Sequence, residues 1–529
     1  MKKSSSENKN VSRAAGVVGF FTLVSRILGL IRDMIVAMYF GTGMVSDAFF
    51  VAFRIPNLLR RLFAEGSMTI SFIPVFTEYL QERSKKDAFE LARVVFTLLS
   101  IILVVVTLLG VLFSPWIVRL QAWGFGGAGD KYELTVLLTR ITFPYILFIS
   151  LVAFFMGILN SLRHFAAPAA APILLNVAII GATFWISPHL SEPIIGVALG
   201  VIIGGVLQVI LQLPWIFRSG VSLRPIWMPG HPAVKRIGML MLPAIFGSAV
   251  YQFNQFIGTL LASLLANGSV SWLYYADRLV QFPLGIFAIA ISTAALPSLS
   301  RQAAEKGLDE FKGTLTHSLR LTFFITIPSM AGLIMLGHPI IKLFFERGVF
   351  DAHSTKMTTL ALIFYSVGLW AFSGIRIMVS AFYALQDTRT PVKVAVIALA
   401  ANLILSLLLM GPLDHGGLAL ALSLASSIQF CLLVFFLKRR ISAWDLGPIL
   451  MSAGKSLAAS AVMCGVICFL YSFQFMSVQT ADILPLAFAV CSTILIGIIT
   501  YFLTAYIFRC REVEYVLDML NALLRKIAG

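Results

Sequence analysis

Charge is scarce in this sequence: only 12% of its 529 residues are Asp, Glu, Lys or Arg, against about a quarter in an ordinary soluble domain. Hydrophobic residues make up 59% of the chain, and its mean hydropathy is +0.92. Apolar runs of about 20 residues, the length that crosses a bilayer as a helix, recur along nearly the whole sequence. This composition excludes a string of soluble domains, a disordered chain and a fibrous repeat. It predicts an all-α polytopic membrane protein.

Cysteine is also rare, and histidine occurs without pattern. The five cysteines lie near the C-terminus, mostly inside apolar runs, where a thiol behaves as a small buried hydrophobe. The seven histidines are scattered, with no paired spacing of the kind that binds a metal. No disulfide scaffold and no metal site are therefore predicted. The sequence also lacks a Walker motif, so ATP hydrolysis within this chain is not expected to drive its activity.

Breaks between the apolar runs predict fourteen membrane spans. More than half of the 40 basic residues fall in one alternate set of loops, whereas the loops of the opposite side hold only Lys131 and Arg347, with three more near span ends. The positive-inside rule then places both termini in the cytoplasm. Basic loops beside anionic lipid headgroups explain the net charge of +16 without a nucleic acid partner. The predicted spans lie near residues 14–40, 47–79, 89–119, 133–160, 166–187, 193–217, 237–266, 270–299, 313–346, 356–386, 391–411, 416–437, 449–474 and 482–508.

The two ends of the chain differ. Residues 1–13 are expected to form a cytoplasmic tail, and its polar part, Met1–Asn10, is expected to be disordered. Residues 509–529 carry apolar side chains at helical spacing, which predicts an amphipathic helix lying on the cytoplasmic face.

A weak internal repeat has a near-constant spacing of roughly 221–225 residues. An offset of six spans preserves direction across the bilayer, so the halves are predicted to be parallel repeats, between which transporters usually hold their substrate. The predicted divisions are an N-lobe at 14–217, a cytoplasmic linker at 218–236, a C-lobe at 237–440 and two extra spans within 441–508. The matched pairs include Arg54 with Arg278, Pro74 with Pro297, Pro168 with Pro391, Gly196 with Gly417, and Gln208 with Gln429. The symmetry breaks where span 1 has Arg26, Arg32 and Asp33 but span 7 has Gln252, Asn254 and Gln255.

Charged residues within the predicted spans are the main functional signal, since each costs about 2.5–3.5 kcal/mol at the centre of a bilayer. In span 2, Asp47, Arg54 and Arg61 are seven apart and Glu65 follows four later, which places them on one helical stripe interrupted by Pro56. The charged residues within the spans are Arg26, Arg32, Asp33, Arg54, Arg60, Arg61, Glu65, Asp277, Arg278 and Arg376.

These charges have two interpretations. They pair with one another and lock helices together, as Arg32–Asp33, Arg61–Glu65 and Asp277–Arg278, or they wall a water-filled chamber between the lobes. Arginines outnumber acids, which favours the chamber, and a guanidinium fork matches phosphate oxygens. We therefore expect an anionic, phosphorylated substrate. The predicted ligands of its anionic group are Arg26, Arg32, Arg60 and Arg278. The predicted supporting or gating residues are Asp33, Asp47, Arg54, Arg61, Glu65, Asp277 and Arg376.

Four segments strongly resemble the MurJ/MviN lipid II flippases of the MOP exporter superfamily: residues 25–33, 47–66, 268–279 and 386–393. The resemblance covers essentially all fourteen spans. It implies movement of undecaprenyl-pyrophosphate-linked peptidoglycan precursor from the cytoplasmic to the periplasmic leaflet. It also implies binding by the arginines that match Arg26, Arg32, Arg60 and Arg278, a need for the acids that match Asp33, Asp47 and Glu65, and a lipid-tail groove at spans 13 and 14. One departure is Gln281, where many relatives have Glu.

The expected protein is thus a flippase of the bacterial inner membrane, not an enzyme, whose partners are lipid II, membrane lipids and the cell-wall synthesis machinery. It needs no cofactor, and a monovalent ion and the membrane potential remain alternative energy sources. An O-antigen-type flippase and a multidrug exporter of the same superfamily are alternatives. A glycosyltransferase is disfavoured because its catalytic and metal-binding acids would need a sizeable extracytoplasmic loop, and the loops here are short and acid-poor. A non-transporting scaffold for cell-wall synthesis is a further alternative.

Overall fold

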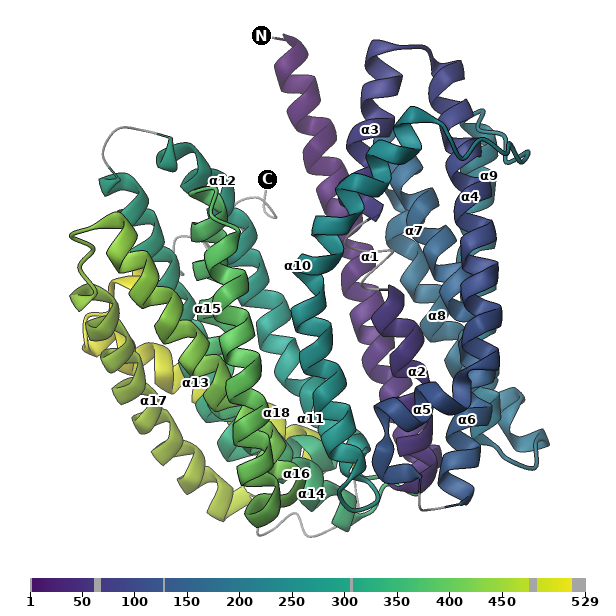
Figure 1. Ribbon diagram of the computed structural model, residues 1–529. Coiled ribbons are helices and arrows are strands. Elements are labelled where there is room, and N and C mark those ends of the chain that lie inside the picture. The colour runs from purple at the N-terminus through teal and green to yellow at the C-terminus, as the bar shows by residue number, and fades with distance from the viewer. Residues whose placement is uncertain (1, 61–67, 127–128, 305–307, 475–482, 516–529) are drawn as a thin grey trace. The chain divides into compact units, whose positions relative to one another are not determined.

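The computed structural model describes residues 2–60, 68–126, 129–304, 308–474 and 483–515 (Figure 1). Every regular element within these ranges is a helix, which confirms the predicted all-α fold class. Contacts group the chain into two compact units, Met1–Ser271 with Arg347–Phe350 (unit 1) and Trp272–Glu346 with Asp351–Gly529 (unit 2). This grouping places the segment 237–271 in unit 1. The lobe boundaries drawn from the sequence repeat stay a prediction.

The described part of unit 1 contains ten α-helices and the first residues of an eleventh. They are α1 (Lys2–Phe40), α2 (Met44–Leu59), α3 (Thr69–Glu82), α4 (Lys85–Leu112), α5 (Ser114–Gln121), α6 (Asp130–Thr142), α7 (Tyr145–Ser161), α8 (Ala166–Trp185), α9 (Ile194–Arg218) and α10 (Pro232–Ser263), with short 3-10 turns η2 (Trp123–Phe125) and η3 (Ser187–His189). One core cluster joins aromatic and aliphatic side chains of α3, α4, α7, α9 and α10, with Phe72, Phe76 and Phe154 fully buried.

Unit 2 contains the rest of α11 and the helices that follow it. They are α11 (Ser269–Pro283), the π-helical turn η4 (Leu284–Ala288), α12 (Ile289–Ala303), α13 (Asp309–Phe345), α14 (Ala352–Val367), α15 (Leu369–Ala384), α16 (Arg389–Ile441), α17 (Gly447–Gln474) and α18 (Ile483–Ile507). Its core is built from α12, α13, α15 and α16, around Phe323, Phe382 and Phe430.

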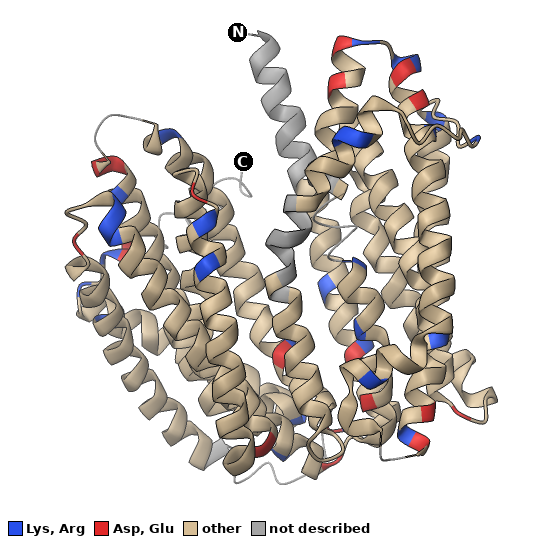
Figure 2. Ribbon diagram, in the orientation of Figure 1, with Lys and Arg blue, Asp and Glu red and all other residues tan. Residues whose placement is uncertain are grey.

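Among the described residues, nine helical segments are long and apolar enough to cross a membrane, and the pair α14 and α15, bent by 43°, makes a tenth. One of the nine, α16, has 53 residues and breaks at Asp414, where φ is 47° and ψ is −135°, so it contains both predicted spans 11 and 12. Predicted span 1 coincides with α1, and predicted span 7 coincides with α10. Predicted span 2 includes most of α2 and of α3, and the residues between 60 and 68 lie outside the described ranges. Each predicted span therefore has a helical counterpart, and the count of fourteen stays a prediction. In Figure 2 the ribbons of α4, α7 and α9 carry no charge along most of their length.

The prediction of an unstructured N-terminal tail is wrong, because α1 begins at Lys2. No Gly or Pro occurs between Lys2 and Ala15. Extending an existing helix adds one hydrogen bond for each residue fixed and needs no new nucleus, so polar residues continue the helix of the apolar segment that follows them. The cytoplasmic location of this end stays a prediction.

The internal repeat is visible in the backbone. Arg163 and Gln386 both have positive φ, at 64° and 56°, and both close a helix in the same way. The N–H of His164 donates to the carbonyl oxygen of Leu159, and the N–H of Asp387 donates to that of Phe382, at 2.8 and 2.9 Å. This is the 6→1 hydrogen bond of a Schellman ending. The sequence analysis did not match these two positions, but their separation falls within the spacing of the repeat, so the two halves share this turn.

A second matched pair is Gly196 and Gly417, each of which lies against the backbone of a preceding turn. A Cβ on Gly196 would meet the nitrogen of Ser187 at 2.7 Å, and a Cβ on Gly417 would meet the carbonyl oxygen of Leu409. A side chain could avoid the added Cβ by adopting another rotamer, but backbone atoms cannot. Only glycine fits at these two positions without a shift of the chain.

We expect the substitution Gly417→Ala to lower the free energy of unfolding by about 1–3 kcal/mol, the usual effect of forcing a methyl group into a packed site. Gly411→Ala is the matched control, since it lies in the same helix and a Cβ there meets nothing within 4 Å. Thermal unfolding of the purified variants in one detergent measures both effects. Equal stability of the two variants would contradict the assigned packing at Gly417.

The segment after α18 is fixed to unit 2 by a buried acid. Glu512 is 2% exposed and accepts hydrogen bonds from Arg320 Nε at 2.6 Å and from Ser452 Oγ at 2.8 Å. Burial alone would raise the pKa of Glu512, but hydrogen bonds from its own backbone N–H, Ser452 and Arg320 lower that pKa. Arg320 lies within predicted span 9, and the sequence analysis did not count it among the charged residues of the spans.

The predicted C-terminal amphipathic helix is described only in part. Residues 511–515 are helical, and Val513 is buried, as expected for a residue on the apolar face. The predicted helix from residue 516 onward lies outside the described residues.

Candidate functional site

In unit 1, Arg32 and Asp33 form an ion pair on α1. Arg32 Nε and Nη2 both donate to Asp33 Oδ1, at 3.0 and 2.7 Å. Both residues are buried, with 9% and 4% of their surfaces exposed. Of the two interpretations of the charged residues, pairing is thus confirmed for Arg32 and Asp33. The pairing offsets part of the cost of burying two charges.

The third group in this cluster is Asn176, in the middle of α8. Its Oδ1 accepts a hydrogen bond from Arg32 Nη1 at 3.0 Å, and its Nδ2 donates to the carbonyl oxygen of Ser25 at 3.0 Å. The sequence analysis missed Asn176. The available signal was an amide in the centre of an apolar run, where a polar side chain is expensive to bury without partners.

Arg26 lies on the same helix as Arg32 and is exposed. Six residues separate the two arginines, which places them about 120° apart around an ideal helix. Because α1 is continuous through this region, the two side chains leave it in different directions.

The predicted stripe on span 2 is divided among different partners. Arg54 Nη1 donates to Thr259 Oγ1 and to the carbonyl oxygen of Gln255, both on α10. Arg60, at the C-terminal end of α2, donates from Nε to Asn57 Oδ1 at 2.9 Å. Arg54 therefore joins α2 to α10. Arg61 and Glu65, and with them the predicted Arg61–Glu65 pair, lie outside the described residues.

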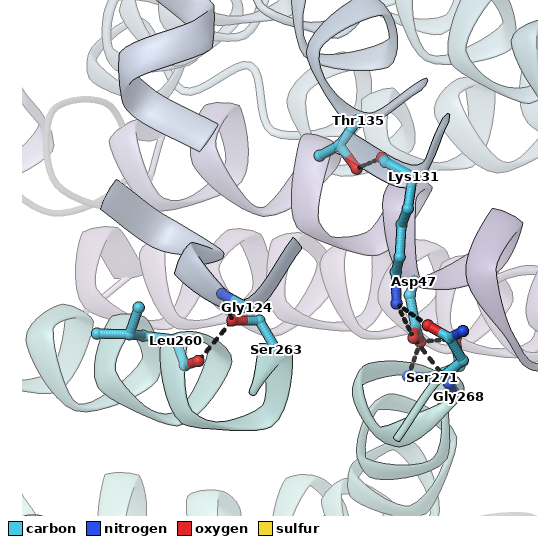
Figure 3. Close-up of polar contacts among 9 residues, drawn as sticks. Asp47, Gly124, Lys131, Thr135, Leu260, Ser263, Gly268 and Ser271 are labelled. Atoms are coloured by element: carbon cyan, nitrogen blue, oxygen red, sulfur yellow. Dashed lines mark hydrogen bonds and ion pairs between the residues drawn. The ribbon is translucent and has the colours of Figure 1, made fainter. Parts of the chain in front are cut away.

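Asp47, in the first turn of α2, is the centre of a second buried cluster (Figure 3). Its Oδ2 accepts from Lys131 Nζ at 2.9 Å and from the N–H of Gly268 at 2.8 Å. Its Oδ1 accepts from the N–H and from the Oγ of Ser271, at 2.9 and 2.7 Å. Four donors therefore surround one carboxylate that is 1% exposed. Charge-assisted bonds of this kind are about twice as strong as neutral ones.

Lys131, in the first turn of α6, has contacts besides its ion pair with Asp47. Its Nζ also donates to Asn267 Oδ1 at 2.8 Å and lies 3.9 Å from the ring centroid of Phe125. The sequence analysis identified Lys131 only as a rare basic residue on the side with few basic residues. Its burial beside Asp47 joins the starts of α2 and α6 to the turn between α10 and α11.

In unit 2, the predicted site residues occur on α11 and α15. Arg278 is exposed, donates from Nη2 to Tyr274 Oη at 2.7 Å and lies 4.8 Å from the centroid of that ring. Asp277 Oδ1 accepts from Gln281 Nε2 at 3.3 Å, so Gln281 contacts an acid one helical turn away. Arg376, on α15, is exposed, and its carbonyl oxygen accepts from Ser380 Oγ at 3.0 Å. The predicted Asp277–Arg278 pair and the predicted chamber walled by four arginines stay predictions.

Long apolar helices that enclose a few fixed charges are typical of a polytopic transporter. The structure is similar to an inward-facing multidrug resistance MATE family transporter of the MOP superfamily, with a TM-score of 0.68 at 14% identity, over 81% of this chain and 98% of that chain. This chain thus shares the fold of that transporter.

The family model described as lipid II flippase MurJ matches residues 36–489. This chain belongs to the lipid II flippase MurJ family, as its motifs predicted. It is 39% identical over 475 residues to the probable lipid II flippase MurJ of Vibrio cholerae, covering 87% of this chain and 89% of the relative. It is 36% identical over 515 residues to the probable lipid II flippase MurJ of Bdellovibrio bacteriovorus, covering 96% of this chain and 97% of the relative. A solved structure of lipid II flippase MurJ in an inward closed conformation matches with a TM-score of 0.78 at 31% identity, over 93% of this chain and 98% of that chain. Family membership and the apolar helices identify a multi-pass protein of the bacterial inner membrane.

Proposed function

We propose that this chain is a lipid II flippase, which moves undecaprenyl-pyrophosphate-linked peptidoglycan precursor from the cytoplasmic to the periplasmic leaflet by alternating access. The observation that carries the proposal is the family match over residues 36–489, together with 39% identity to a curated relative over 87% of the chain. The role is transport without catalysis. Its partners are lipid II, the surrounding lipids and the cell-wall synthesis machinery that uses the product.

The pyrophosphate of lipid II is the group that the arginines bind. Arg26, Arg32, Arg60 and Arg278 act as its ligands, and Arg54, Arg61, Arg376 and the acids Asp33, Asp47, Glu65 and Asp277 support or gate them. Arginine suits this role because its planar fork matches phosphate oxygens and stays charged at every physiological pH. Support comes from the position of Arg32, which is buried on α1 and donates hydrogen bonds to Asp33 and Asn176. A guanidinium carries five N–H groups, so one arginine can donate to several acceptors at once.

The direction of transport follows from topology and charge. Both termini lie in the cytoplasm, and the empty binding region carries a net positive charge. After the substrate is released, the empty binding region turns back toward the cytoplasm. The membrane potential lowers the free energy of this step by about 2.3 kcal/mol per 100 mV for each positive charge that moves inward across the membrane. The potential then favours the return of the empty protein, and a monovalent ion is the alternative driving species.

Leaflet-resolved labelling of lipid II in cells depleted of this protein tests the proposal. We expect lipid II to accumulate on the cytoplasmic side and to become inaccessible from outside, and re-expression to restore its accessibility. A non-transporting scaffold would leave that accessibility normal, and this outcome would refute the proposal. If the purified protein binds a cationic drug more tightly than lipid II, that result would favour a multidrug exporter instead.

A further inference from the structure

Asn176 joins two points of α1 that are seven residues apart. Its amide binds the guanidinium of Arg32 on one side and the carbonyl oxygen of Ser25, the residue before Arg26, on the other. We propose that Asn176 is a positioning residue, which holds Arg32 in the orientation that binds the pyrophosphate of lipid II. This inference depends on the proposed function, and it names a residue of that same site.

The hydrogen bonds of Asn176 fix the orientation of its amide. Arg32 can only donate, so it requires the amide oxygen, and the carbonyl oxygen of Ser25 can only accept, so it requires the amide nitrogen. Rotation of the amide by 180° would break both contacts. The side chain is 6% exposed, and both of its polar groups have a partner, which offsets the cost of an amide in the membrane interior.

Asp33 and Asn176 bind different parts of the Arg32 guanidinium. Nε and Nη2 donate to Asp33 Oδ1 at one edge of the fork. Nη1, the other terminal nitrogen, donates to Asn176 Oδ1. Contacts at both ends of this planar group restrict its rotation more than contacts at one edge do. Binding that needs no reordering of the arginine loses less conformational entropy, so the fixed fork gives higher affinity for an anion.

The charge of the residue at position 176 also matters. Arg32 and Asp33 together are neutral, and the neutral amide of Asn176 leaves them so. An aspartate at position 176 would add a negative charge beside the anion ligand, and its second oxygen would face the carbonyl oxygen of Ser25 with no hydrogen between them. The substitution Asn176→Asp should therefore weaken anion binding even though it strengthens the attraction to Arg32.

The test measures the affinity of purified, full-length protein for lipid II by native mass spectrometry. Asn176→Leu removes both hydrogen bonds and replaces the amide with a side chain of similar volume. We expect it to weaken lipid II binding about tenfold. Asn176→Asp should weaken binding at least as much. Gln208→Leu is the matched control, because the Gln208 side chain donates to the carbonyl oxygen of Ala171 on the same helix, α8, at 3.0 Å. We expect it to lower the melting temperature about as much as Asn176→Leu and to leave lipid II binding unchanged.

A double variant separates positioning from a general structural role. If Asn176 acts through Arg32, Asn176→Leu has little further effect on affinity once Arg32→Ala is present. Equal weakening by Asn176→Leu with and without Arg32 would overturn the inference, as would normal binding by both Asn176 variants. Failure of the unmodified protein to bind lipid II would instead refute the proposed function, so the two failures are distinguishable.

Discussion

The substitution Arg32→Glu is expected to reduce lipid II flipping on the order of 100-fold or more, the effect of removing a buried charge that binds an oppositely charged group. A carboxylate at this position would repel the pyrophosphate and would lie beside Asp33 and the amide oxygen of Asn176, both of which accept hydrogen bonds. Arg278→Glu is expected to have a similar effect on flipping and little effect on stability, since Arg278 is exposed. Leaflet-resolved labelling of lipid II in cells that depend on each variant measures the effect.

An exchange of the pair distinguishes anion binding from a purely structural ion pair. The double substitution Arg32→Asp with Asp33→Arg keeps both charges and their adjacency but moves the guanidinium about 100° around the helix. We expect flipping to remain lost, because the arginine no longer faces Asn176. Restored flipping would show that the ion pair, and not the position of the arginine, is what the protein needs. Arg301→Glu, on an exposed residue at the end of α12, is the control and should flip lipid II normally.

The second large effect is expected at Asp47. Asp47→Asn removes the charge that balances buried Lys131 and points an amide NH₂ at groups that also donate, so we expect the free energy of unfolding to fall by about 3–5 kcal/mol. Thermal unfolding in detergent provides the measurement. Asp130→Asn is the control, because Asp130 is an exposed acid next to Lys131 in the chain and its loss should change stability by less than about 0.5 kcal/mol.

A double-mutant cycle tests whether Asp47 and Lys131 act as a pair. Lys131→Met should destabilise the protein by itself, because it leaves the Asp47 carboxylate buried without a cation. When combined with Asp47→Asn, it should destabilise less than the sum of the two single changes, since neither variant group is then an uncompensated charge. Additive effects would contradict the central role assigned to this ion pair.

Fold class could be predicted from the sequence because apolar runs of bilayer length are a local property. The ends of helices were less predictable. The helical extension of α1 to Lys2 depends on the energy of continuing a helix, which polar composition does not reveal. The break at Asp414 within α16 depends on one residue with positive φ. The family was predictable because its motifs are long, and the comparison with known proteins confirmed it.

The partners of the site residues were predictable only where they are neighbours in the chain. The pair formed by Arg32 and Asp33 was foreseen as one of two interpretations, since adjacent opposite charges always have the opportunity to meet. Asn176 lies 144 residues from Arg32, and Lys131 lies 84 residues from Asp47. No periodicity connects such positions, because only the packing of α8 on α1 and of α6 on α2 brings them together. The stripe predicted on span 2 placed its residues on one face without showing that Arg54 contacts α10.

The matching turns at Arg163 and Gln386 have a consequence for the ancestry of the chain. Their main-chain bonding is the same, while one side chain is a cation and the other a neutral amide. Backbone geometry of this kind is what a duplicated ancestral half would retain while its side chains diverged. The first half has Arg26 and Arg32 where the second has amides such as Gln252 and Asn254. A symmetric framework therefore carries an asymmetric set of charges.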